Sequence, residues 1–311
     1  MADNKLSKGG QALLEGIMMK GPEGYSVAVR NPDGGIEVNV HPNNPQKFSS
    51  VPVLRGMVNF IDSLLTGYKC IMESAEISMG TELEEDAFER WLKKHFGDKS
   101  TEIITTVAGV LGAALALVLF MVLPTTFTGL LDSVIHLGGL KAAVEGVTKL
   151  VIFILYLWGV SKMKEIKRVF MYHGAEHKTI SCYEAGQPLT VENVRKHTRF
   201  HPRCGTSFMF IVLIVSIAVF SFVPWKSTLS RALMKVIFLP VVVGIAYEIL
   251  KYTGRKQNAC TKLMAAPGLW FQKLTTSEPD DDMIEVAIAS VNAILPETIV
   301  EKETVENEQS E

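Results

Sequence analysis

Residues 103–131, IITTVAGVLGAALALVLFMVLPTTFTGLL, carry no charged side chain, and Glu102 and Asp132 bound this run of 29 residues. An apolar helix of about 20 residues crosses the roughly 30 Å hydrocarbon core of a bilayer. Residues 104–123 are therefore expected to form a membrane span. The composition, with 48% hydrophobic residues and a mean hydropathy of +0.22, also favours a membrane protein over a soluble globule.

Three further segments are candidates for membrane spans. Residues 142–160 are apolar apart from Glu145 and Lys149, whose i, i+4 spacing lets them pair on one helix face. Residues 204–225 contain no charge, and residues 232–250 are apolar except near their ends. The predicted fold is mostly α, a polytopic membrane protein with about four transmembrane helices.

The loop between the second and third spans, residues 161–203, carries nine Lys and Arg residues and is therefore expected to be cytoplasmic. With an even number of spans, the N- and C-termini are cytoplasmic as well. The sequence thus predicts a multi-pass protein of the cell membrane, in contact with membrane lipid.

Outside the spans, residues 25–30 and 36–40 resemble two strands joined by the Gly-rich turn Asn31-PDGG, which indicates a small N-terminal β unit. Residues 53–79 are helical in composition but too polar to cross lipid. They are expected either to lie along the membrane face or to pack on the β unit. A helix with acids in its first turn is expected to begin after Ser277.

The composition divides the chain into consecutive segments. In order, these are a cytoplasmic β unit (1–50), an amphipathic helical segment (51–100), a four-span membrane domain that includes a cytoplasmic helical loop (101–250, loop 161–203), a cytoplasmic C-terminal helical segment (251–296) and a disordered acidic tail (297–311).

The clearest chemical signal is the pentapeptide His173-Gly-Ala-Glu-His177 in the cytoplasmic loop. On a helix, the H-x-x-E-H pattern places both histidines and Glu176 on one face about one turn apart. Two imidazoles so placed can chelate one metal ion, and a neighbouring Glu can act as general base on metal-bound water, as in inverted zincin peptidases. Glu176 is accordingly the predicted catalytic residue, and His173 and His177 are predicted metal ligands.

His201 and Cys204 stand at the start of the third predicted span, and Glu248 near the end of the fourth, so all three are expected at the cytoplasmic face. An imidazole and a thiolate suit Zn²⁺ or another divalent transition metal. These residues and Glu184 are further candidate ligands. Four protein ligands would make a closed, structural site, whereas three would leave a position for water, and the sequence leaves both possibilities open.

Plainer interpretations of the same residues exist. His173 and His177 can be polar residues on an amphipathic helix, and Cys204 can be a buried thiol that packs like a small hydrophobe. Glu248 can pair with Lys251 or lie among the lipid headgroups. The four cysteines are irregularly spaced and are expected to be reduced.

Four sequence blocks resemble the YqhQ-like family of bacterial membrane proteins: GGQALLEGIMMKGP, YHGAEHKTISCYEAG, LTVENVRKHTRFHPRCGTSF and APGLWFQKLTTSEPDDDMIEVAI. The blocks are distributed over almost the whole chain. The resemblance implies a predicted metal-dependent enzyme without an assigned substrate. It also directs attention to the polar residues Gln11, Glu15 and Arg55 of the N-terminal part.

Three function classes follow. The leading one is a metal-dependent hydrolase at the cytoplasmic membrane face that acts on a peptide bond, a lipid or a headgroup ester. The others are a scaffold or assembly factor with a structural metal site, and a metal ion transporter. The sequence contains no nucleic-acid-binding motif, P-loop or dinucleotide fingerprint, and it does not indicate an oligomeric state.

Overall fold

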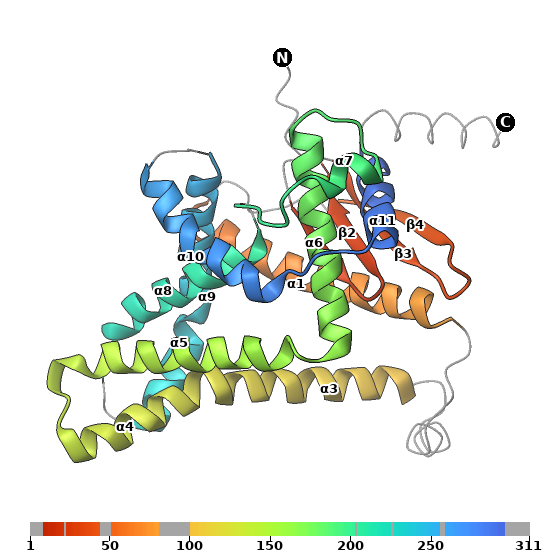
Figure 1. Ribbon diagram of the computed structural model, residues 1–311. Helices are drawn as coiled ribbons and strands as arrows, with labels where there is room; N and C mark the ends of the chain where they lie inside the picture. The colour runs from red at the N-terminus through yellow and green to blue at the C-terminus, as the bar shows by residue number, and fades with distance from the viewer. Residues whose placement is uncertain are drawn as a thin grey trace. The chain divides into compact units, whose positions relative to one another are not determined.

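The computed structural model describes residues 9–21, 23–43, 51–80, 100–202, 204–224, 227–255 and 259–295. Most of these residues are helical, and one small antiparallel sheet is formed near the N-terminus (Figure 1). The expected class, mainly helical with a small N-terminal β unit, is therefore confirmed.

The strands are β1 (Gly10–Leu13), β2 (Gly16–Lys20), β3 (Gly24–Arg30) and β4 (Ile36–Pro42). The helical elements before the loop that carries the histidines are α1 (Leu54–Met79), α3 (Ser100–Leu117), the π-helical η2 (Val118–Val122), α4 (Leu123–Ile135), the 3-10 turn η3 (Gly138–Leu140) and α5 (Lys141–Val160). The remaining helices are α6 (Lys164–Glu184), α7 (Val191–Arg195), α8 (Gly205–Ser221), α9 (Thr228–Arg255), α10 (Ala259–Thr275) and α11 (Asp281–Asn292).

The four strands form an antiparallel meander in the order β1-β2-β3-β4. The predicted β3–β4 hairpin is confirmed: the Asn31 side-chain oxygen accepts the N–H of Gly35 at 2.7 Å, and Gly34 has a φ of 87°. The sequence analysis does not predict β1 and β2 individually, because Leu14 and Glu15 join them without a typical turn residue. Glu15 has a positive φ of 49°, a conformation that favours Gly or Asn.

Both faces of the sheet are covered. Ile17, Met19 and Ala28 pack against α6 and α11, whereas Met18 and Val27, one residue along each strand, pack on the opposite face. This alternation follows from the two-residue side-chain period of a strand. Figure 1 shows α6 and α11 beside the strands. The sheet is thus held between helices and fixes the position of α6, which carries the histidine motif.

Helix α1 contacts the sheet through β3 and β1, and its Cys70 joins the cluster around Val27. Of the two expectations for residues 53–79, packing on the β unit is therefore observed. Ile61, Leu64 and Leu65, on another face of α1, are exposed.

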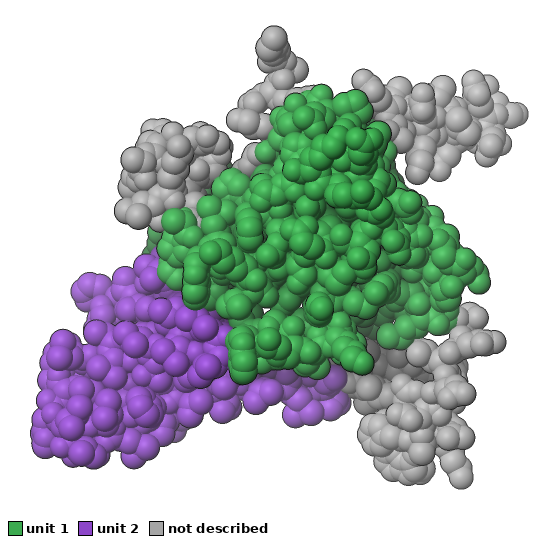
Figure 2. Space-filling view, viewed as in Figure 1, with its two compact units in different colours: residues 1–80, 157–212, 243–311 green, residues 81–156, 213–242 purple. Residues whose placement is uncertain are grey.

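The chain forms two compact units, shown in Figure 2. Unit 1 comprises residues 1–80, 157–212 and 243–311, and unit 2 comprises residues 81–156 and 213–242. Each unit combines segments that are distant along the sequence. The segments expected from composition are consecutive stretches of the sequence, whereas the units are defined by contacts in space. The expected segments stay a prediction.

Within the described residues, three helices are long and apolar enough to cross a membrane, at Thr106–Ile135, Gly138–Val160 and Leu229–Tyr252. The first continues past Leu123, because Pro124 stands in the first turn of α4, where its missing N–H is tolerated. The third predicted span corresponds to α8, whose 17 residues extend for only about 26 Å. Three of the four expected helices thus have the length of a span, and the predicted end of the third, at Trp225, lies outside the described residues.

The C-terminal helix begins later than expected. Its N-cap is Asp280 rather than Ser277, and Asp281 and Asp282 provide the predicted acids of the first turn. Ser277 instead donates its backbone N–H to the Phe170 carbonyl oxygen of α6 at 2.8 Å. The predicted acidic tail, residues 297–311, lies outside the described residues.

Candidate metal centre

The HGAEH pentapeptide lies in the middle of α6, as its helical spacing predicts. The rings of His173 and His177 face each other in an edge-to-face arrangement, with centroids 4.4 Å apart. Cys204 immediately precedes α8, and its thiol is buried. One potential ligand atom each of His173, His177 and Cys204 lies within 4.8 Å of the other two, which is close enough to share a metal ion.

The hydrogen bonds of the two rings define which nitrogen carries the proton. His173 Nδ1 lies 2.8 Å from the Thr275 carbonyl oxygen, and His177 Nδ1 lies 2.6 Å from that of Arg199. Because a carbonyl oxygen only accepts, both Nδ1 atoms carry hydrogen, and in the neutral form of each ring Nε2 presents a lone pair. Metal-binding histidines are typically oriented in this way.

The two Nε2 atoms differ in what they contact. His173 Nε2 is 3.1 Å from the Cys204 sulfur, whereas the buried His177 Nε2 has no hydrogen-bond partner within the described part of the chain. A buried acceptor without a partner costs about 1–3 kcal/mol, and a metal ion at this position would satisfy it. The set of possible ligands, two imidazole nitrogens and one thiolate, is also of the type that binds Zn²⁺.

Gly174, the second residue of the pentapeptide, allows a close approach of α6 to the chain after α10. A Cβ atom at this position would lie 2.0 Å from the Ser277 carbonyl oxygen. Only glycine fits such a contact without movement of the backbone. The approach also brings Thr275 to His173, so the glycine has a direct part in orienting the first histidine.

The loop before Cys204 is fixed by a reciprocal pair of hydrogen bonds. The Gln272 side-chain oxygen accepts the His201 N–H at 2.8 Å, and its amide group donates to the His201 carbonyl oxygen at 2.7 Å. Arg199 donates to the carbonyl oxygen of Thr276. The end of α10 therefore holds the loop that supplies the Arg199 carbonyl to His177.

His201 and Glu184 lie beside the three-residue cluster. The His201 ring is 5.8 Å from the His177 ring, between centroids, and its Nε2 is 3.4 Å from Glu184 Oε2. These two residues contact each other, and neither belongs to the set that includes Cys204. Their role as ligands stays a prediction.

Glu248 has a different partner. It accepts from Arg55 through both carboxylate oxygens, with 2.7 Å between Arg55 Nε and Oε1, and also lies 3.4 Å from the Val53 N–H. Arg55, to which the family resemblance directs attention, thus pairs with this carboxylate. Glu248 is not among the residues gathered around His173.

Glu176 is buried and points to the sheet. Its Oε1 accepts the Gly10 N–H of β1 at 2.9 Å, and its buried Oε2 has no hydrogen-bond partner among the residues that the structure describes. The sheet thus holds one oxygen of the carboxylate in place.

The turn between β1 and β2 also contacts α6. Glu15 accepts from Arg168 through both carboxylate oxygens at 2.5 Å, and the Tyr172 hydroxyl lies 3.2 Å away. The hydrogen bond from Arg168 lowers the pKa of Glu15, while burial, together with the Glu15 charge, raises the pKa of Tyr172. Gln11 points to α1, with its Oε1 2.6 Å from where a Gly67 Cβ would be. These residues tie the hairpin to the helix that carries the histidines.

The groups that orient the ligands could not be predicted from the sequence; they are the carbonyls of Arg199 and Thr275 and the Gln272 amide. Every residue has a backbone carbonyl, so the residue type does not indicate which carbonyl will orient a ligand. The quoted block APGLWFQKLTTSEPDDD, which contains Gln272 and Thr275, was the available indication that this segment belongs to the site.

Fold and site together define a mostly helical protein with three apolar helices of membrane-crossing length and a largely buried His–His–Cys cluster, as far as the described residues extend. Residues 51–297 match the family described as "Protein of unknown function (DUF1385)", and the chain belongs to this family. It is 38% identical over 292 residues to "Uncharacterized protein YqhQ" of Bacillus subtilis (strain 168), with 92% of each chain covered. The expected relation to the YqhQ-like family is confirmed. No solved structure matches the chain.

Gly174→Ala is expected to lower the free energy of unfolding by about 1–3 kcal/mol, because the new Cβ overlaps the Ser277 carbonyl oxygen. Thermal unfolding of the purified protein measures the change. Gly159→Ala is the matched control, since that helical glycine has open space around it and alanine has the higher helix propensity. Equal stability of the Gly174→Ala and wild-type proteins would contradict the close approach.

Proposed function

We propose that this protein is a multi-pass membrane enzyme that uses a divalent transition metal, most simply Zn²⁺, to hydrolyse its substrate at the cytoplasmic membrane face. The observation that carries the proposal is the shared orientation of His173 and His177. Each donates Nδ1–H to a backbone carbonyl, and each presents Nε2 in the cluster with Cys204.

Three protein ligands favour an enzyme over a structural site, because a tetrahedral ion then keeps one position for water or substrate. Bound Zn²⁺ supplies Lewis acidity and lowers the pKa of a bound water. The protein's own contribution is to hold two neutral imidazoles by their Nδ1–H groups and to keep the Cys204 thiol out of bulk solvent.

Glu176 is the proposed general base. It lies within one helical turn of both histidines, and the Gly10 N–H holds its Oε1, while no described residue bonds to its Oε2. A carboxylate with one fixed and one free oxygen is suited to accept a proton at the free oxygen and to release it to a leaving group. The substrate class proposed is a peptide bond or a lipid ester near the membrane surface.

A scaffold with a closed metal site is the second candidate. His201 favours it, because its ring is 5.8 Å from that of His177, between centroids, and a small movement would bring a fourth ligand to the cluster. A closed site holds segments together and leaves no position for substrate.

The membrane part of the proposal comprises four spans, with α8 as the shortest, and cytoplasmic N- and C-termini. It is supported by the three apolar helices and by the nine Lys and Arg residues of segment 161–203. The histidine cluster then belongs to the cytoplasmic side.

Purified protein is expected to hold about one equivalent of zinc, because imidazole and thiolate ligands suit this metal. Elemental mass spectrometry measures the metal content. The double variant His173→Ala, His177→Ala is expected to lose this metal, and Cys204→Ser to hold it more weakly. His197→Ala, in the same segment but hydrogen-bonded to Gln187, is the control and should keep it. Wild-type protein that cannot be loaded with any transition metal would refute the metal site.

Glu176→Gln is expected to keep the metal and to reduce activity by about 10²- to 10⁴-fold, the usual contribution of a general base. The readout is complementation of a deletion strain, in parallel with metal content. Glu165→Gln, an exposed acid in the first turn of α6, should complement fully. Full complementation by Glu176→Gln with metal retained would favour the scaffold, and loss of metal would make Glu176 a ligand.

Single cysteines at Lys196 and Ser227, each in a cysteine-free background, test the membrane topology. The Lys196 side chain is 61% exposed, whereas Lys178 in the same loop is buried, so a cysteine at position 178 would be shielded from the reagent. An impermeant thiol reagent is expected to label position 227 in intact cells and position 196 only after permeabilisation. Labelling of position 196 in intact cells would exclude a cytoplasmic histidine cluster.

A further inference from the structure

Unit 2 contains a second polar cluster, formed by charged side chains within the apolar helices. Glu145 and Lys149 of α5 and Arg231 and Lys235 of α9 are 4%, 8%, 1% and 0% exposed, respectively. Ionisable groups in membrane-crossing helices are costly and mark functional sites by default. None of these residues contributes to the candidate metal centre.

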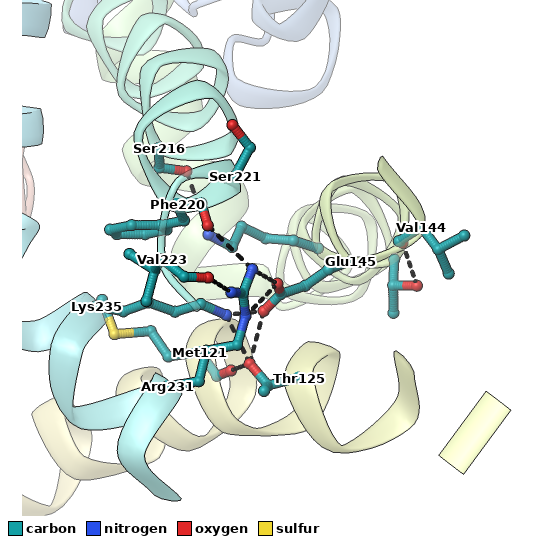
Figure 3. Close-up of polar contacts among 12 residues, drawn as sticks. Met121, Thr125, Val144, Glu145, Ser216, Phe220, Ser221, Val223, Arg231 and Lys235 are labelled. Atoms are coloured by element: carbon teal, nitrogen blue, oxygen red, sulfur yellow. Dashed lines mark hydrogen bonds and ion pairs between the residues drawn. The ribbon is translucent and has the colours of Figure 1, made fainter. Parts of the chain in front are cut away.

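The single acid of the cluster is shared by two cations. Arg231 donates to Glu145 Oε2 from Nε at 3.1 Å and from an Nη atom at 2.8 Å, and Lys235 pairs with Oε1 (Figure 3). The Thr125 hydroxyl lies 2.6 Å from Glu145 Oε1 and 2.6 Å from Lys235 Nζ. The hydrogen-bonding capacity of the carboxylate is therefore largely used by Arg231, Lys235 and Thr125.

Lys149 has neutral partners. Its Nζ donates to the Ser216 hydroxyl at 3.2 Å and lies 5.0 Å from the centre of the Phe220 ring. Ser216 donates its own proton to the Leu213 carbonyl oxygen. The cluster thus contains three basic side chains but one carboxylate, which Arg231 and Lys235 use. A buried positive charge without a counter-charge is strongly unfavourable.

A small cavity adjoins Lys149. It has a volume of about 10 Å³ and is lined by Lys149, Arg231, Glu145, Ser216, Ser221 and Ala142, among others. A cavity of this size holds about one water molecule, so chloride, which is somewhat larger than water, would enter with a small displacement of the lining side chains. The cavity has no room for a phosphate or a lipid headgroup.

We propose that this cavity binds one small monovalent anion, of the size of chloride. The anion accepts hydrogen bonds from Lys149 Nζ and lies near the Arg231 guanidinium. It compensates part of the positive charge that Glu145 alone does not neutralise. The site therefore stabilises the packing of α5, α8 and α9 within unit 2. This inference goes beyond the proposed hydrolase and does not depend on it.

Thermal unfolding of the full-length protein in detergent tests the site. At about 0.1 M sodium salt and constant ionic strength, chloride is expected to raise the unfolding temperature by about 2–4 °C relative to gluconate, which is too large for the cavity. Bromide, the larger halide, should act less strongly than chloride, and sulfate should act like gluconate. Equal unfolding temperatures of the wild-type protein in chloride and gluconate would refute the proposal and indicate a water molecule in the cavity.

Two variants locate the effect. Lys149→Gln removes the proposed hydrogen-bond donor, and Ala142→Val fills the cavity without changing any charge, so both are expected to abolish the difference between chloride and gluconate. Lys141→Gln, which removes a more exposed lysine of the same helix, should retain it. If Lys149→Gln does not fold, Ala142→Val decides, and a chloride effect that persists in Ala142→Val overturns the assignment.

Discussion

The contact between α6 and the Ser277 carbonyl at Gly174 is the constraint on which the candidate metal centre depends. It brings the end of α10 against the helix, so that Thr275 reaches His173 and Gln272 holds the loop before Cys204. That loop in turn supplies the Arg199 carbonyl to His177. Both imidazoles are therefore oriented by segments distant from them in sequence, and both orientations require the same close packing.

Much of the fold is predictable because it follows from simple periodicity and charge. The charge-free run before Asp132 predicts an apolar helix, and the turn at Asn31 predicts the β3–β4 hairpin. The third span is less clear, since the sequence shows where charges are absent but not that α8 ends at Ser221. Ser277 resembles a helix cap in sequence, yet its backbone bonds to Phe170, a tertiary contact that local patterns cannot reveal.

The candidate site was predictable in part. The i, i+4 spacing of His173 and His177 predicts their common face, and Cys204, which the sequence also offers as a ligand, lies close to both. Glu248 was ambiguous, because pairing with Arg55 depends on how α1 meets α9.

The partners of the buried charges in α5 were not predictable either. Glu145 and Lys149 have the spacing of an ion pair, but α9 presents two cations to Glu145, and Lys149 bonds to Ser216 instead. Side-chain partners across helices are a property of packing and not of spacing.

The contacts of the N-terminal sheet with α6 bear on where this family's domain begins. The matched region starts at residue 51, yet Gly10 bonds to Glu176, Glu15 bonds to Arg168, and Ile17 and Met19 cover the apolar face of α6. A chain shortened to residue 51 would leave this face in water and would be prone to aggregate. The strands that precede the family match therefore belong to the same compact unit as α6.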